Sequence, residues 1–144
     1  IHFVGNTMLQ EVKQAYSKAC IDCHVAAFES NMPKAYMAAD LVISRAGAST
    51  IAELLYCQVP SILIPYPFAA DNHQFKNGKY IEQIVQGGIV LSEDELDERQ
   101  LTAAILKITE DSSLKKMREN IRSDTTSYFR RNFSEKILST LQNL

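Results

Sequence analysis

Short apolar runs of strand length alternate with stretches of helical periodicity along most of this sequence. The expected strands are Ile1 to Val4, Cys23 to Ala27, Leu41 to Ser44, Ser61 to Ile64 and Gly88 to Leu91. The expected helices are Leu9 to Ala19, Met32 to Ala39, Thr50 to Cys57, His73 to Val85 and Asp97 to Thr109, followed by helices near 113–122 and 134–142. Strands that alternate with helices are joined by right-handed crossovers and pair in parallel. We therefore predict an α/β fold, a doubly wound parallel sheet followed by C-terminal helices.

The length of the chain limits its organisation. Its 144 residues suffice for one hydrophobic core, and the sequence contains no internal repeat or low-complexity linker. We therefore predict a single domain over residues 1–144. Because Ile1 opens directly into an expected strand, with no signal-like segment before it, we expect this domain to be a fragment of a longer protein. No apolar run approaches the roughly 18 residues that a membrane-spanning helix needs.

Basic residues are concentrated toward the C-terminal end. The formal net charge is −2, but residues 115–136 hold seven basic side chains against three acidic ones. Such a segment could favour an anionic surface, although it is more often the solvated face of a helix. We prefer the solvated face, and we predict no nucleic-acid binding.

One cysteine motif matches a pattern whose chemistry does not fit its surroundings. Residues 20–24 read Cys-Ile-Asp-Cys-His, the C-x-x-C-H pattern of covalent haem attachment. Apolar residues at helical spacing precede this motif, and an expected strand begins at Cys23. The motif would therefore lie across a helix-to-strand turn. A structural zinc site usually needs four ligands, and no second Cys or His pair lies at a suitable spacing. We therefore expect neither haem nor a metal site, and free thiols at the cysteines.

A loop of small residues follows the third expected strand and leads directly into a helix. It reads Arg45-Ala46-Gly47-Ala48-Ser49-Thr50. Free N–H groups at a helix start and the helix dipole both favour an anion, and Gly47 would let a phosphate approach the backbone closely. The spacing matches neither the Walker pattern nor G-x-G-x-x-G, so neither ATP hydrolysis nor a bound dinucleotide follows.

Glu53 has two interpretations. Thr50-Ile51-Ala52-Glu53 is a capping-box sequence, in which the Glu53 carboxylate would only accept the N–H of Thr50. In the other interpretation Glu53 accepts hydrogen bonds from a ribose while the helix start holds phosphates. Local sequence alone favours the capping box.

A second polar loop follows the fourth expected strand. Its polar residues gather at the opening of the next helix, and they are Asp71, Asn72, His73, Gln74 and Asn77. Amide and imidazole groups supply both the donors and the acceptors that sugar hydroxyls require. The alternative is that Asp71 or Asn72 merely caps the helix. Because both loops leave the carboxyl ends of strands, where such sheets bind ligands, we expect them to form one site.

Together the two loops resemble a known family. The segments that carry the resemblance are Ser44 to Leu54, Val59 to Pro65, and Asp71 to Gln74 with Asn77. They resemble the C-terminal half of the MurG family, GT-B N-acetylglucosaminyltransferases of glycosyltransferase family 28. The resemblance covers most of residues 1 to about 108, and the C-terminal helices match only in kind.

This resemblance implies the Rossmann-like, donor-binding half of an inverting enzyme. The family moves N-acetylglucosamine from UDP-N-acetylglucosamine to lipid I, undecaprenyl-diphospho-N-acetylmuramoyl-pentapeptide, and so forms lipid II for peptidoglycan. It needs no metal or other cofactor, and it lies peripherally on the cytoplasmic face of the bacterial inner membrane. The catalytic base belongs to its N-terminal acceptor domain. That domain, and the first β-α unit with a glycine-rich loop, would precede Ile1, so the fragment alone would bind donor without turnover.

The resemblance also implies roles for residues around the nucleotide. The residues expected to border the uracil are Phe28, Glu29 and Met32. Ser49 and Thr50 are expected to meet the diphosphate at the helix start, and Gly47 and Ala48 are expected to belong to the same donor-binding set. Glu53 would hold the ribose hydroxyls, so the resemblance favours the ligand interpretation over the cap. Arg45 would shape the loop or balance the charge of the diphosphate.

The sugar would be held by the second loop. His73 and Gln74 would contact the N-acetylglucosamine, with Asn77 close by. Some members of the family carry two glutamines where this chain has His73-Gln74, and Gly78 stands where alanine is usual. Two alternatives therefore stay open. One is a domain or subunit of another UDP-sugar GT-B transferase with a glycolipid or dolichol-linked acceptor, and the other is a non-enzymatic α/β interaction domain whose loops carry only helix caps.

Overall fold

The computed structural model of the chain describes residues 1–110 and 112–126, in two compact units. The first unit is Ile1–Ala38, and the second begins at Ala39. In the first, strands β1 (His2–Phe3) and β2 (Val25–Ala26) pair in parallel. Helix α1 (Gly5–Lys18) connects them, and the short helix α2 (Met32–Met37) follows. This unit is therefore one β-α-β element with an added helix.

The second unit contains a parallel sheet of three strands. They are β3 (Val42–Ser44), β4 (Ser61–Leu63) and β5 (Gly88–Val90), in that spatial order. Helix α3 (Ala48–Cys57) connects β3 to β4. The short turn η1 (Ala70–Asn72), helix α4 (His73–Lys79) and the π-helical turn η2 (Tyr80–Val85) connect β4 to β5. After β5 come the short turn η3 (Glu93–Glu95), helix α5 (Glu98–Thr109) and a helical segment over 113–126.

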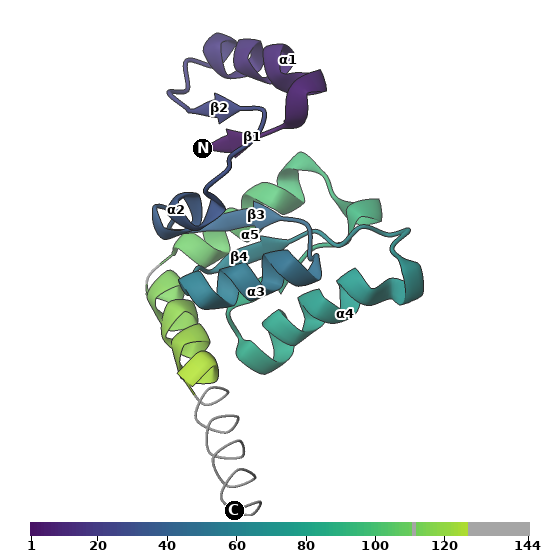
Figure 1. The fold of residues 1–144 in the computed structure, drawn as a ribbon, viewed down its shortest axis with the longest axis vertical. Coiled ribbons are helices and arrows are strands. Elements are labelled where there is room, and N and C mark those ends of the chain that lie inside the picture. The colour runs from purple at the N-terminus through teal and green to yellow at the C-terminus, as the bar shows by residue number, and fades with distance from the viewer. Residues whose placement is uncertain (111, 127–144) are drawn as a thin grey trace, which may run out of the picture. The chain divides into compact units, whose positions relative to one another are not determined.

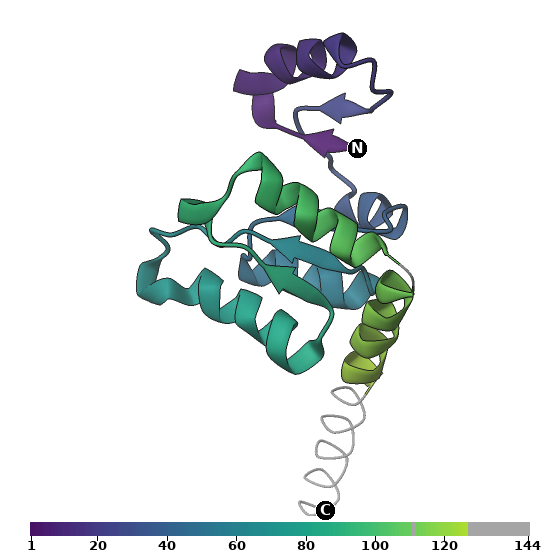
Figure 2. The same ribbon diagram turned by 180° about the vertical axis from the view of Figure 1, so that it is seen from behind.

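Helices cover both faces of this sheet. Helix α3 lies in front of the strands in Figure 1, and α5 lies in front of them in Figure 2, which shows the opposite side. Ile62 of the central strand packs with Ala104 and Ile108 of α5 in one buried cluster, while α3 contributes buried Ile51 and Leu54. The predicted α/β fold with a parallel sheet covered by helices is confirmed.

The predicted elements are present, with shifted bounds. Each strand is shorter than its apolar run, and α3 begins two residues before the predicted Thr50. The predicted helix over 73–85 changes to π-helical geometry after Lys79. The helix over 113–126 extends past the predicted end near residue 122, whereas the predicted helix over 134–142 lies outside the described residues.

Gly78 is buried inside α4 for a steric reason. A Cβ at this position would lie 2.9 Å from Cγ2 of Val90 and 3.5 Å from Cγ of Pro65. A glycine in a helix costs about 1 kcal/mol relative to alanine. Here the missing side chain lets α4 approach β5 and the end of β4 closely, which explains the departure from alanine.

Candidate functional site

The carboxyl ends of β3, β4 and β5 meet at one edge of the sheet, because the three strands are parallel and adjacent. The segment after β3 leads into α3, the segment after β4 leads into α4, and the segment after β5 leads into η3. Ligands of open α/β sheets bind in the loops at this edge. Both polar loops identified in the sequence therefore lie at the edge where a site is expected.

The start of α3 is open. Its N-cap residue, Gly47, has an extended backbone, and no side chain caps the helix. The first hydrogen bond of this helix runs from the N–H of Ile51 to the carbonyl oxygen of Gly47 at 2.9 Å. The preceding N–H groups of Ala48, Ser49 and Thr50 therefore have no partner in the helix, and no described side chain accepts them. Three donors and the positive end of the helix dipole are available to an anion.

Gly47 is not required by the backbone or by packing within the second unit. Its φ of −65° is ordinary for any residue. A Cβ built here would have one neighbour within 4 Å, Oγ1 of Thr50 at 3.7 Å, which is normal contact. The fold itself would therefore accept alanine at this position.

The structure contradicts the capping-box interpretation of Glu53. Because α3 begins at Ala48, Thr50 lies inside its first turn and is not the N-cap. The small residues before Thr50 extend the helix backwards to Gly47, which moves the cap away from the reach of Glu53. No hydrogen bond or ion pair of the Glu53 carboxylate occurs within 1–110 and 112–126. Its charge acts on Cys57 one turn later, where burial first and Glu53 second raise the pKa of the thiol.

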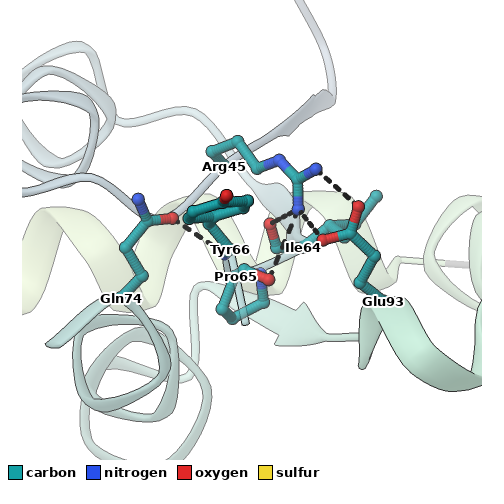
Figure 3. A network of polar contacts seen from close by, with 6 residues as sticks. All are labelled: Arg45, Ile64, Pro65, Tyr66, Gln74 and Glu93. Carbon is teal, nitrogen blue, oxygen red and sulfur yellow. Dashed lines mark hydrogen bonds and ion pairs between the residues drawn. The ribbon is translucent and has the colours of Figure 1, made fainter. Parts of the chain in front are cut away.

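Arg45 connects the loops that follow all three strands (Figure 3). One terminal nitrogen, Nη1, donates to the carbonyl oxygens of Ile64 and Pro65, at 3.3 and 3.4 Å. Both terminal nitrogens donate to the Glu93 carboxylate, at 2.6 and 2.7 Å. The guanidinium also lies over the Tyr66 ring, 5.6 Å from its centroid. Arg45 thus shapes this edge of the sheet, one of the two roles expected for it.

The ion pair between Arg45 and Glu93 favours the charged form of both groups. The paired hydrogen bonds from Arg45 hold the pKa of Glu93 below its usual value, and those to Glu93 raise the pKa of Arg45. Both side chains remain partly exposed, at 47% and 36%. Solvent therefore screens the pair, and its main effect is on orientation.

The second polar loop uses its side chains to shape itself. The Gln74 side-chain oxygen accepts the N–H of Tyr66 at 3.0 Å, as Figure 3 shows, and Nδ1 of His73 lies 2.6 Å from the carbonyl oxygen of Ala70. Asp71 and Asn72 have left-handed backbones, and neither side chain caps α4. Asn72 occupies the N-cap position of α4 without a capping hydrogen bond, so the suggestion that the side chain of Asp71 or Asn72 caps this helix is wrong.

Asn77 joins the two loops. Its side-chain nitrogen donates to the carbonyl oxygen of Ala46 at 3.0 Å, so the second turn of α4 is tied to the loop before α3. Through this bond the structure brings the candidate sugar residues of α4 close to the candidate phosphate residues of α3.

The remaining candidate residues belong to the first unit. Phe28 is 79% exposed, and Glu29 accepts the backbone N–H of Asn31 at 2.7 Å. Met32 is the first residue of α2, and it is half-buried. Arg45 and the eight other candidates all lie in the second unit.

Sequence reasoning missed Glu93 and Tyr66, which complete the network of Arg45. Glu93 follows β5, and the carboxyl end of β5 lies beside that of β4. An acidic residue just after the last expected strand was the sequence signal that could have pointed to a partner for Arg45. Residues from the segments after β4 and β5, among them Tyr66, Phe75 and Glu93, line a hollow of about 240 Å³. A larger hollow of about 380 Å³ lies between α3, Tyr80 and the helix over 113–126, with a mostly apolar lining.

No group of three or more His, Cys, Asp or Glu side chains that could hold a metal ion occurs in the described part of the chain. The C-x-x-C-H sequence does lie across the turn between α1 and β2, as predicted. Cys20 is exposed, Cys23 is half-buried, and both thiols are free.

Comparison with known families decides the membership of this chain. The model of the glycosyltransferase family 28 C-terminal domain matches residues 1–136. The chain belongs to this family. The resemblance seen in the two loops is thereby confirmed, and the open start of α3 and the network of Arg45 lie within the matched residues.

The family 28 chain is also similar to curated bacterial proteins. It is 48% identical over 110 residues to one from Desulfotalea psychrophila, covering 75% of this chain and 29% of that protein. It is 38% identical over 141 residues to one from Protochlamydia amoebophila, covering 97% of this chain and 38% of that protein. Both are named UDP-N-acetylglucosamine--N-acetylmuramyl-(pentapeptide) pyrophosphoryl-undecaprenol N-acetylglucosamine transferase. The chain thus spans about a third of the length of these relatives.

Solved structures agree with the family. The Acinetobacter baumannii MurG structure matches with a TM-score of 0.78 at 27% identity, over 85% of this chain and 37% of that one. The spinosyn forosaminyltransferase SpnP matches with a TM-score of 0.56 at 15% identity, over 87% of this chain and 38% of that one, which indicates a shared fold alone.

Proposed function

We propose that this chain is the donor-binding part of an inverting transferase that moves N-acetylglucosamine from UDP-N-acetylglucosamine to lipid I and forms lipid II. The observation that carries this proposal is the uncapped start of α3, with three free N–H groups, at the ligand-binding edge of a family 28 domain. The names of the bacterial relatives supply the donor and the acceptor.

In this proposal the diphosphate lies against the start of α3. The N–H groups of Ala48, Ser49 and Thr50 donate to its oxygens, and the absence of a side chain at Gly47 leaves room for its approach. Glu53, one turn further on, accepts the ribose hydroxyls, since no described residue engages its carboxylate.

The sugar faces the start of α4. Gln74 and His73 each use one polar atom within the loop, which leaves the Gln74 amide nitrogen and the second ring nitrogen of His73 for hydroxyl or acetamido groups. Asn77, which binds Ala46, holds the two halves of this site together and contacts the sugar only at its margin.

In this proposal these residues stabilise the leaving group. In an inverting transfer the acceptor hydroxyl attacks the anomeric carbon from the face opposite UDP, and negative charge develops on the departing diphosphate. Preorganised N–H groups and a helix dipole stabilise that charge without a reorganisation cost. We assign the base that deprotonates the acceptor to a part of the protein outside this chain.

We further propose a peripheral location on the cytoplasmic face of the inner membrane, where a lipid-linked acceptor is reached. Among the described residues, no helix is both long and apolar enough to cross a bilayer. The location follows from the acceptor in the relatives' names rather than from a surface of this chain.

Transfer of labelled N-acetylglucosamine to a lipid I analogue tests this function. The protein carrying this chain is incubated with labelled UDP-N-acetylglucosamine and the analogue, and the lipid product is measured. Label in the lipid supports the proposal. Binding of the donor without transfer to lipid I, but with transfer to another lipid acceptor, would favour another UDP-sugar transferase, and no binding of any UDP-sugar would favour an interaction domain.

A further inference from the structure

The Arg45–Glu93 ion pair is a doubly hydrogen-bonded contact at the sheet edge for which the proposed function gives no role. Glu93 begins the short turn after β5, and Arg45 directly follows β3, so the pair crosses over the central strand β4. The Glu93 carboxylate accepts one hydrogen bond from each terminal nitrogen of the guanidinium, at 2.6 and 2.7 Å. Two parallel hydrogen bonds fix the plane of the guanidinium as well as its position.

Arg45 contacts the segment that leads to α4 and directly precedes the loop that leads to α3, so its orientation affects both parts of the proposed site. Held by Glu93, the guanidinium donates to the carbonyl oxygens of Ile64 and Pro65 and lies over the Tyr66 ring. The N–H of Tyr66 in turn donates to Gln74 at the start of α4 (Figure 3). In the other direction, Arg45 is two residues before Gly47, the N-cap of α3.

The exposure of the pair argues against a role in stability alone. With 47% and 36% of the two side chains exposed, solvent screens most of the attraction, and such pairs contribute little to folding. An exposed pair with ideal paired geometry is better suited to setting the direction of a side chain.

We propose that Glu93 is a positioning residue for the donor site. It acts through Arg45, holding the segment after β4 and thereby Gln74 in the arrangement that receives the sugar of UDP-N-acetylglucosamine. The inference rests on the proposed function and extends it to the segment after β5, which contains none of the expected ligand residues. Glu93 itself touches no part of the donor in this account.

Binding of two probes to Glu93→Gln tests the proposal. UDP and UDP-N-acetylglucosamine are titrated by calorimetry into the protein carrying this chain and into the variant, at a temperature where circular dichroism shows both folded. Loss of a charge-assisted pair predicts roughly five- to tenfold weaker binding of UDP-N-acetylglucosamine and less than about a twofold change for UDP. The matched control is Glu95→Gln, the same substitution at an exposed position of the same turn.

A double-mutant cycle tests whether Glu93 acts through Arg45. Arg45→Gln and the double variant are titrated in the same way, and the double variant should bind the donor no more weakly than Arg45→Gln alone, because the two residues act as one unit. Additive losses would overturn the proposed route through Arg45.

Each remaining outcome has a defined meaning. Unchanged affinities in Glu93→Gln with a lowered melting temperature would make the pair purely structural and overturn the inference. Tighter binding of UDP in Glu93→Gln would mean that Glu93 competes with phosphate for Arg45, which also overturns it. If the unsubstituted protein binds neither probe, the proposed function fails, and the inference fails with it.

Discussion

The two helix starts at the sheet edge are built in opposite ways. At the start of α3 no side chain caps the helix, and the backbone donors of Ala48, Ser49 and Thr50 remain free. At the start of α4 the polar side chains of His73 and Gln74 bind the backbone of their own loop. The start of α3 thus offers backbone N–H groups, whereas the start of α4 offers side chains that also stabilise the conformation of their own loop.

This difference predicts how substitutions will behave. Changes at the start of α3 should affect binding much more than folding, because no side chain there caps the helix. Changes at the start of α4 should affect both, because each side chain removed also leaves a backbone group without its partner.

The largest effect is expected for Gly47→Ala. The fold accepts the new Cβ, so the free energy of unfolding should fall by no more than about 1 kcal/mol, the cost of alanine at an N-cap. The methyl group would displace the diphosphate from several N–H groups, and affinity for both UDP and UDP-N-acetylglucosamine should fall at least about a hundredfold. Calorimetry and urea unfolding measure the two quantities.

Gly88→Ala provides the contrast for that experiment. A Cβ at Gly88 would overlap the backbone oxygen of Ser61 in the neighbouring strand, so this variant should be severely destabilised. If Gly47→Ala binds both ligands normally, the diphosphate does not lie over Gly47.

Glu53→Gln should have the next largest effect. The variant lacks the negative charge of the carboxylate that accepts hydrogen bonds from the ribose hydroxyls. Binding of UDP and of UDP-N-acetylglucosamine should therefore weaken equally, by about tenfold, because both ligands carry the ribose. Stability should not change, since the carboxylate has no hydrogen-bond partner within the described residues. Glu119→Gln, an exposed helical position, is the matched control, and equal affinities in the two variants would remove Glu53 from the site.

Gln74→Ala should show most clearly how the start of α4 differs from the start of α3. The variant loses the acceptor for the N–H of Tyr66, so the free energy of unfolding should fall by about 1 kcal/mol. Binding of UDP-N-acetylglucosamine should weaken several-fold more than binding of UDP. Gln100→Ala, on the exposed surface of α5, should change neither quantity. An equal loss for both ligands in Gln74→Ala would argue against contact with the sugar.

The smallest effect concerns the pH dependence of the Arg45–Glu93 pair. Because Arg45 lowers the pKa of Glu93, the stabilisation from this pair is fully present above the ordinary glutamate pKa of about 4.3 and is lost as the pH falls through the lower folded value. The difference in unfolding free energy between the unsubstituted protein and Glu93→Gln should therefore be constant from pH 8 to about pH 5. It should close below that, in urea titrations at a series of pH values, and a difference that begins to close near pH 7 would contradict the assignment to Glu93.

The sequence predicted the order of strands and helices because apolar runs and helical spacing report burial directly. It also placed the two polar loops at one edge, since parallel strands share a direction. It misjudged the start of α3 by two residues, and with it the local preference for a capping box at Glu53, because small residues carry little signal for where a helix begins. The link from Arg45 to Glu93 spans 48 positions, and only the register of the folded sheet brings the two together.

The central claim is that the free N–H groups at the start of α3 receive the diphosphate of UDP-N-acetylglucosamine. The most direct test is to titrate this donor into the ¹⁵N-labelled protein and follow the backbone amide signals. We predict that the amides of Ala48, Ser49 and Thr50 shift most, and that UDP alone shifts them in the same direction. Saturable binding that leaves these three amides unmoved, and instead shifts the residues around Tyr56 and Tyr80, would contradict the account.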